Sequence, residues 1–245
     1  MSKVQGGINQ IVTDGLVFYI DAANHKSYIS GSGDTSDSTT YSLINNITGS
    51  VSSSVIYDTD NLGSWRLDEI GKINCQDPYP TTYSNLSFAC WVYVWNLNVS
   101  GAPYGDNNDL VSKWDVSSSE KVFRLQIQGT SITQGSPKII ISADGGTDTA
   151  TFTHSDRVEK GNWYYIVGTH DNIAQKIGIS VNGNPFEITD YSSGAKIAPN
   201  QVKIGGINDE NSWGGKIACV QLYSKPLSDE EALQNYNSLK HRFNL

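Results

Sequence analysis

Clusters of Asp and Asn are the first side chains in this sequence whose types and spacing could do chemistry. Calcium takes about six to eight oxygen ligands, which Asp and Asn can supply. The chain has three oxygen-rich clusters: residues 106–109, Asp144 with Asp148, and residues 208–211. None has the ligand spacing of a calcium-binding loop, and Asp and Asn also stabilise turns without any metal. Each cluster therefore fits either a metal site or a plain turn.

Aromatic rings in loop-like segments form the second group, because exposed rings can stack on sugars or anchor a protein partner. These rings belong to Trp65, Trp114, Trp213, Tyr79, Tyr83 and Tyr104. From both groups, we expect the ligand-binding residues to be Trp114, Trp213, Tyr104 and Asp109. Packing is the competing explanation for loop aromatics, and Trp91 and Trp163 are expected in the core.

The sequence lacks the arrangements that enzymes use. Glycosidases need a pair of carboxylates that flank the scissile bond, whereas Glu187 and Asp190 are offset by three residues. The four histidines lie far apart, and neither a Gly-x-Ser-x-Gly elbow nor a phosphate-binding glycine loop occurs. We therefore predict that the protein is not an enzyme and has no catalytic residues.

Composition restricts the class of partner. The formal net charge of −8 argues against nucleic acid, because binding to phosphates depends on clustered Lys and Arg. No run of eighteen apolar residues occurs, which argues against membrane insertion. The three cysteines show no disulfide or zinc pattern and are expected to be buried thiols. The first ten residues lack a secretory signal, so we expect folding in a reducing cytosol.

Strands must position these side chains, because the apolar residues alternate with period two. In residues 86–95 both faces of the alternating pattern are largely apolar, which predicts a central strand covered on both sides. Similar runs occur at residues 15–21, 121–128, 137–143, 162–170, 176–181, 201–205 and 216–224. Their spacing predicts an all-β fold, a two-sheet antiparallel β-sandwich of the jelly-roll kind.

Two local signals refine this fold. Asn182-Gly183 predicts a tight hairpin after residues 176–181, because both residues tolerate a positive φ. Ser228 and Glu231 predict the capped start of a short C-terminal helix, with Leu227 and Ala232 as the flanking apolar pair. The helix is expected to dock through Leu233, Tyr236 and Leu239.

We expect one domain over residues 13–245, preceded by an arm at residues 1–12. Residues 30–64 are rich in Ser, Thr, Asn, Asp and Gly, which predicts long loops with one or two edge strands. A linker between two domains is the alternative for this segment, but the single strand before it cannot fold alone.

Four sequence blocks resemble the laminin-G-like branch of the concanavalin-A-like sandwich proteins. They are LSFACWVYVW (86–95), LVSKWDVSSSEKVFRLQIQ (110–128), KGNWYYIVGTHDNIAQKIGISVNGNPF (160–186) and VKIGGINDENSWGGKIACVQLYSKPLSDEEALQNYN (202–237). The resemblance implies a concanavalin-A-like jelly roll that binds rather than cleaves, because the Glu-x-Asp-x-x-Glu strand of glucanases on this fold is missing. It also implies a possible calcium ion at the rim of the sandwich, for which the candidate ligands are Asp106, Asp109 and Asp209.

A narrower resemblance covers residues 11–33, which look like the opening of laminin-G-like proteins of tailed bacteriophages. The sequence departs from those proteins at residues 64–75. This resemblance implies a virion protein made in the host cytoplasm, a homo-oligomer on capsid, tail or fibre that binds glycans or neighbouring virion subunits. Two alternatives stay open: a free lectin or glycan-active enzyme on the same fold, and a cellular protein-interaction module.

Overall fold

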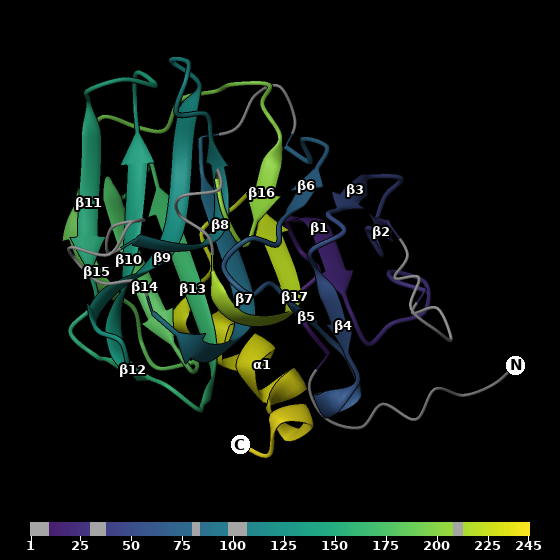
Figure 1. Ribbon diagram of the computed structural model, residues 1–245. Coiled ribbons are helices and arrows are strands. Elements are labelled where there is room, and N and C mark those ends of the chain that lie inside the picture. Colours follow the sequence, from purple (N-terminus) through teal and green to yellow (C-terminus); the bar gives the residue numbers. More distant parts are fainter. Residues whose placement is uncertain (1–9, 30–37, 80–83, 98–106, 208–212) are drawn as a thin grey trace, which may run out of the picture.

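The computed structural model describes residues 10–29, 38–79, 84–97, 107–207 and 213–245, and these residues form two antiparallel sheets packed face to face (Figure 1). The eight-stranded sheet contains, in spatial order, β15 (Glu187–Asp190), β14 (Lys176–Val181), β13 (Trp163–Asp171), β7 (Leu86–Asn96), β17 (Gly214–Tyr223), β5 (Ser64–Arg66) and β4 (Ile56–Asp58), with β1 (Leu16–Asp21) also paired to β17. The nine-stranded sheet contains β11 (Thr149–Thr153), β10 (Gln134–Ser142), β9 (Lys121–Ser131), β8 (Asn107–Trp114), β16 (Val202–Ile204), β6 (Ile73–Cys75), β3 (Thr48–Val51) and β2 (Thr39–Tyr41), with β12 (Val158–Glu159) paired to β10. This architecture confirms the predicted sandwich, and all eight predicted strand runs are strands.

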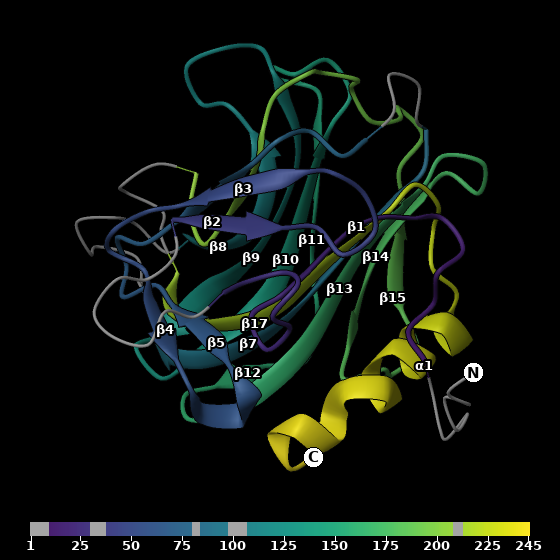
Figure 2. The same cartoon turned by 90° about the vertical axis from the view of Figure 1, so that its right-hand side faces the viewer.

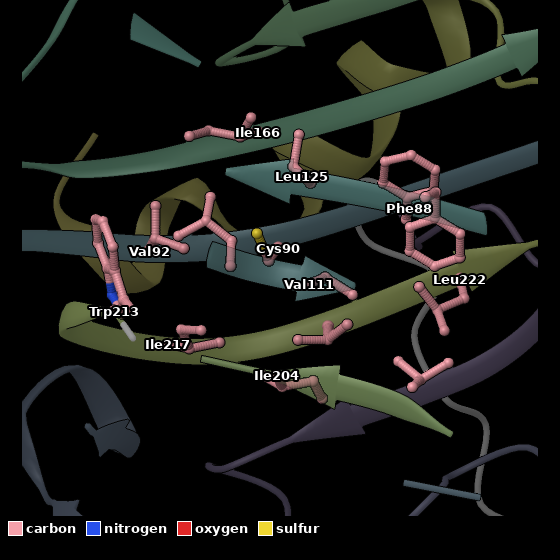
Figure 3. Close-up of a cluster of buried hydrophobic side chains, with 14 of the residues drawn as sticks. Phe88, Cys90, Val92, Val111, Leu125, Ile166, Ile204, Trp213, Ile217 and Leu222 are labelled. Carbon is pink, nitrogen blue, oxygen red and sulfur yellow. The ribbon is translucent and has the colours of Figure 1, made fainter. Parts of the chain in front are cut away.

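β7 is the central strand, and its two faces contribute to two separate cores. Phe88, Cys90 and Val92 point between the sheets, where they pack with residues such as Val111 and Leu222 (Figure 3). Ala89 and Trp91, on the opposite face, belong to a smaller cluster outside the eight-stranded sheet. Because alternate side chains of a strand point to opposite faces, the doubly apolar pattern of residues 86–95 correctly predicted cover on both sides.

The second core is closed by α1 (Asp229–Leu239) and the following 3₁₀ turn, η2 (Lys240–Phe243), which lie against the outer face of the eight-stranded sheet (Figure 2). α1 starts at the predicted capping box, in which the Glu231 amide donates to the Ser228 hydroxyl and the Ser228 amide donates to Glu231. The box satisfies two amides that a helix start would otherwise leave unpaired.

The buried face of α1 differs from the expected stripe. Ala232, Asn235 and Ser238 are the buried residues, whereas Leu233 is 45% exposed. The expectation for Leu233 was therefore wrong, whereas Tyr236 and Leu239 pack against the second core as expected. Small residues face the sheet, so the helix backbone comes close to it, and a Cβ added at Gly183 would lie 3.0 Å from Leu233 Cα.

That close approach occurs at the predicted hairpin. Asn182 and Gly183 have φ angles of 54° and 73°, and they join β14 to the segment that leads into β15. Gly183 thus meets two requirements that favour glycine, a positive φ and a neighbouring helix.

The N-terminal part is more regular than the sequence predicts. Of the segment at residues 30–64, residues 30–37 lie outside the described residues, and residues 38–63 hold three short strands, β2, β3 and β4, and a 3₁₀ turn, η1 (Asp60–Leu62), instead of loops with one or two strands. The sequence did not predict these strands, because each has only three or four residues and lies in a segment of polar composition. Val12, within the predicted arm, is buried and its amide donates to Asn235 Oδ1 at 2.7 Å, while residues 1–9 lie outside the described residues.

Cys75, Cys90 and Cys219 are free and buried, as expected. Burial raises the pKa of the Cys75 thiol to about 12. Within the described ranges, no helix has the length and apolar character needed to cross a bilayer.

Candidate functional site

The strongest candidate site surrounds Trp95, near the end of β7. Trp91, Tyr93 and Trp95 share the outer face of this strand, but the helix covers it unevenly. Trp91 stacks on Phe243 with ring centroids 4.3 Å apart, whereas Trp95 lies beyond that cover and is 43% exposed. A half-exposed indole at the end of an otherwise buried aromatic row offers a flat apolar surface to a ligand.

Two adjoining hollows border Trp95, and together they define the Trp95 site. The larger has a volume of about 410 Å³ and is lined by Asp68, Glu69, Trp95, Asn96, Lys160 and Gly214. The smaller has a volume of about 200 Å³ and is lined by Tyr93, Val94, Trp95, Lys160, Gly161 and Lys216. Trp95 and Lys160 line both hollows, so the indole and one ammonium group stand where they meet.

A carboxylate and an amide face the indole from the larger hollow. Asn96 Nδ2 donates to Glu69 Oε1 at 2.8 Å. This bond fixes both side chains, and no other side chain of the described residues occupies Glu69 Oε2 or Asn96 Oδ1, which remain as acceptors. Within that part of the chain, no carboxylate pairs with the Lys160 ammonium group, which supplies donors. The site thus combines fixed acceptors, a cationic donor and an aromatic face.

An unusual turn presents Glu69. Asp68 and Glu69 have φ angles of 47° and 69°, in the left-handed region that non-glycine residues rarely adopt. Backbone hydrogen bonds hold the turn in place: the Glu69 amide donates to Trp213 O at 3.1 Å, and the Gly71 amide donates to Leu67 O at 2.6 Å. Such conformations cost free energy and persist where surrounding contacts enforce them, often at functional sites.

Gly214 allows the turn and β7 to meet. A Cβ at this position would lie 2.8 Å from Asn96 O and 3.2 Å from Glu69 Cγ. A larger residue would therefore push Glu69 or the β7 backbone away. The Trp-Gly-Gly sequence at residues 213–215 is thus part of the construction of the site.

Ion pairs neutralise most other charges near the indole. Arg66 Nε lies 2.9 Å from Asp68 Oδ2, and the Arg66 guanidinium lies 5.5 Å from the Trp95 ring centroid. Lys216 Nζ lies 2.6 Å from Asp58 Oδ2. Burial alone would raise the pKa of Asp58, but the hydrogen bonds from Lys216 and from the Asp60 amide outweigh it and lower the pKa. Glu69 and Lys160 are left as the groups available to a ligand.

The structure places the aromatic residues expected from the sequence elsewhere. Trp213 is completely buried in the inter-sheet core beside Val92 (Figure 3), and its Nε1 donates to Lys216 O at 3.2 Å. Trp114 is only 7% exposed, and the Arg124 guanidinium lies 5.6 Å from its ring centroid. Both indoles are therefore much less exposed than that of Trp95, which is 43% exposed.

Asp109, which was expected both to bind the ligand and to coordinate calcium, lies inside β8 and is fully buried. Its Oδ1 accepts from Arg124 Nε at 2.9 Å and its Oδ2 accepts from Arg124 Nη2 at 2.8 Å. Burial raises the pKa of Asp109 and the arginine opposes that shift. Because the guanidinium engages both oxygens, this geometry is that of a buried ion pair rather than a metal ligand.

The remaining expected ligands, Tyr104, Asp106 and Asp209, lie outside the described residues. Asp144 accepts hydrogen bonds from the amides of Gly146 at 2.7 Å and Asp148 at 3.1 Å, which is the geometry of a plain Asx turn. Within the described ranges, no group of three or more His, Cys, Asp or Glu side chains is arranged to hold a metal ion.

The sequence contains a signal for Trp95, although this residue lies outside the loop-like segments in which we expected the binding aromatics. The order Trp91, Tyr93, Trp95 places three aromatic rings on one strand face. A short C-terminal helix cannot cover a whole strand of this length, so the last ring was a candidate for exposure. Glu69 had no comparable signal.

Comparison with solved structures shows that the fold recurs in toxin binding domains. The chain has a TM-score of 0.67 with the binding domain of Paraclostridial Mosquitocidal Protein 1, at 14% identity, over 91% of this chain and 52% of that one. For the receptor binding domain of the botulinum neurotoxin C/D mosaic serotype, the TM-score is 0.65 at 13% identity, over 93% and 52%. For the botulinum neurotoxin serotype D ligand binding domain in complex with N-acetylneuraminic acid, it is 0.65 at 13% identity, over 92% and 51%.

The chain spans about half the length of these solved structures, and at such low identity the likeness shows a shared fold alone. A comparison with curated protein sequences found no match. A family model, described as the concanavalin A-like lectin/glucanases superfamily, matches residues 71–232, which is more than half of the chain. The two sheets, the capped helix and this match together show that the chain belongs to the concanavalin A-like lectin/glucanases superfamily, on its laminin-G-like branch.

Proposed function

We propose that this protein is a carbohydrate-binding domain without enzymatic activity, and that it binds sugars at the Trp95 site. The observation that carries the proposal is the half-exposed Trp95 indole between two hollows, faced by Glu69, Asn96 and Lys160. A sugar ring has an apolar face of C–H groups and a rim of hydroxyls. An indole stacks on the first, and fixed acceptors with a cationic donor bind the second.

The distribution of charge favours binding over hydrolysis. A glycosidase needs two carboxylates, one of them available as a proton donor, on either side of the bond that is cleaved. At the Trp95 site Asp68 is paired with Arg66 and Glu69 is held by the amide of Asn96. This arrangement can orient the hydroxyl groups of a sugar. Among the described residues, however, no second unpaired carboxyl group lies opposite Glu69.

The family and the shared fold add support. The superfamily includes lectins. Among the solved structures with this fold, one binding domain is in complex with N-acetylneuraminic acid and another with SialylT. These ligands belong to those proteins, but they make a glycan screen the natural first experiment for this chain.

The test is a glycan array followed by calorimetric titration of the best ligand with wild-type protein and variants. Trp95→Ala should weaken binding at least about tenfold, which corresponds to about 1.4 kcal/mol, because the stacking surface is lost. Glu69→Gln should also weaken binding, since it keeps the shape but removes the negative acceptor.

Tyr41→Ala is the matched control, because Tyr41 is likewise 43% exposed but lies on β2 of the other sheet. It should leave sugar affinity unchanged. Binding that Trp95→Ala and Tyr41→Ala weaken equally would show that the site is elsewhere. If no glycan binds the wild-type protein, the proposed function itself fails.

We also propose that this protein is a component of a virion. It would be made in the host cytoplasm and displayed on the capsid, tail or fibre. The support is the resemblance of residues 11–33 to the opening of laminin-G-like proteins of tailed bacteriophages. Mass spectrometry of purified particles should detect the chain. Particles without it would leave a free lectin as the better assignment.

A further inference from the structure

The open edge of β11 carries an inference independent of sugar binding. β11 ends the nine-stranded sheet and lies at the outer side of the molecule (Figure 1). Its sequence, Thr-Ala-Thr-Phe-Thr, holds no charge and no proline. Edge strands are usually protected by charges, prolines or bulges, because their free backbone groups can pair with another strand. β11 has none of these, and its register with β10 is unbroken.

The pairing with β10 determines which backbone groups are free. The Ala143 amide donates to Asp148 O at 2.9 Å, and the His154 amide donates to Pro137 O at 2.9 Å. Antiparallel strands alternate bonded and non-bonded pairs, so the even-numbered residues from 148 to 154 face β10. The amides and carbonyls of Thr149, Thr151 and Thr153 therefore point away from the sheet.

A neighbouring contact agrees with this assignment. Ser155 belongs to the same odd-numbered series, and its amide donates outward to Glu187 Oε2 at 2.9 Å. Within the described residues, no hydrogen bond reaches the backbone of Thr149, Thr151 or Thr153 beyond β11. A hollow of about 630 Å³ lies beside Thr149 and leaves space along this edge.

We propose that β11 pairs with β11 of a second copy of this chain, in a two-fold antiparallel dimer that joins the two nine-stranded sheets. The three outward residues are spaced symmetrically about Thr151. In a two-fold pair, Thr149 therefore lies opposite Thr153 of the second copy, and Thr151 lies opposite its own counterpart. Each outward amide then meets an outward carbonyl, and no like charges face each other within the strand.

The other sheet edges fit a second copy less well. On β15, Glu187 and Asp190 stand at the two ends, so antiparallel self-pairing would bring carboxylates opposite each other. β2 and β4 have only three residues each, and Asp58 on β4 is held by Lys216. Among these edges, β11 is the longest that carries no charge.

The contact is small, because it involves five residues from each copy. Interfaces well below about 1,200 Å² belong to weak or transient complexes. The dimer is therefore expected at high local concentration, as when several copies are held on one surface, and a weak dimer would raise the avidity of the sugar site.

Sedimentation velocity from micromolar to millimolar protein tests the proposal. The wild-type chain should show a concentration-dependent dimer. Thr151→Pro should abolish it, because the lost amide points outward and the ladder with β10 is unaffected. A chain that stays monomeric over the whole range would overturn the proposal, whatever the result of the glycan experiment.

A charge exchange tests the register. Thr151→Lys and Thr151→Glu should each weaken the dimer by roughly two- to fivefold, because like charges then face each other across the axis. An equimolar mixture of the two variants should recover or exceed wild-type association. Thr13→Lys, a charge change at an exposed position outside β11, should have no effect. The β11 register would be overturned if neither Thr151 substitution changed the dissociation constant of the dimer. It would also be overturned if the mixture associated no more tightly than either variant alone.

Hydrogen exchange gives a readout that does not depend on variants. The amides of Thr149, Thr151 and Thr153 should exchange more slowly as protein concentration rises. The amides of Ala150 and Phe152 already bond to β10, so they should be protected at every concentration. Uniform protection of all five amides, independent of concentration, would contradict the free edge.

Discussion

His170, at the end of β13, is a buried residue that makes stability depend on pH. Its ring is fully buried, lies 5.8 Å from the Tyr191 ring, and neither ring nitrogen makes a hydrogen bond of good geometry to a described residue. Burial lowers the pKa of His170 below its usual value of 6.5, and the Ser84 backbone and Asp171 oppose this only in part. Charging this ring in the core is therefore unfavourable.

The direction of the pH effect follows from proton binding. Below pH 6.5 the unfolded chain protonates this histidine, while the folded chain does so only at lower pH. The unfolded state then binds more protons than the folded state. The free energy of unfolding should therefore be greatest above about pH 6.5, and it should decrease as the pH falls from there toward the pKa of His170 in the folded state. Urea denaturation at a series of pH values between about 7 and 5 measures this slope.

The matched variants separate His170 from other groups. His170→Leu should reduce the slope, because the titrating group is gone and an apolar side chain replaces it in the core. His25→Gln changes an exposed histidine and should keep the wild-type slope. A slope that persists in His170→Leu would assign the pH dependence to other residues.

At the scale of elements, local signals in the sequence were sufficient for the long strands and the helix. Alternation predicted β7 and the division of its side chains between two cores, and Ser228 with Glu231 predicted the start of α1. The hairpin at Asn182-Gly183 was also predicted correctly. Each of these signals lies within a few residues of the feature that it predicts.

Elements defined by distant contacts were missed. β8 begins with a polar segment that we interpreted as a ligand cluster, yet Asp109 forms an ion pair with Arg124 of the neighbouring strand. A buried polar side chain in a strand can be recognised only when its partner is known. β11 was missed as well: Thr-Ala-Thr-Phe-Thr alternates polar and apolar residues, but it has only five residues, and one of its two apolar side chains is a small alanine.

The Trp95 site has the same limitation. The exposure of Trp95 depends on how far α1 and η2 reach across the sheet. Glu69 belongs to residues 64–75, where the sequence departs from the proteins that residues 11–33 resemble. Positive φ angles at Asp68 and Glu69 cannot be inferred from residue types that usually avoid them. The family resemblance implied a fold that binds glycans, but the residue types did not indicate where the candidate site lies.

At the scale of the whole molecule, Arg242 connects the C-terminal turn with the N-terminal third of the chain. Its Nη1 donates to Asp21 Oδ1 at 2.7 Å, its Nε donates to Asn61 O at 2.6 Å, and its Nη2 donates to Gly63 O. Asn61 returns a hydrogen bond to Arg242 O at 3.0 Å. Since Arg242 and Asp21 are each only 7% exposed, this network closes the fold in a place where water cannot replace a lost partner.

We therefore expect Arg242→Met to lower the free energy of unfolding by about 3–5 kcal/mol, the usual cost of leaving one partner of a buried ion pair alone. Asp21→Asn should be destabilising too, but the double variant should lose less than the sum of the two, because it leaves no unpaired buried charge. Chemical denaturation of the four proteins measures the coupling. Lys26→Met, at an exposed position, is the control and should change stability little. If the losses of free energy from Arg242→Met and Asp21→Asn were additive, the two side chains would not be coupled. The arginine would then stabilise the fold through its hydrogen bonds to the carbonyls of Asn61 and Gly63 rather than through the Asp21 carboxylate.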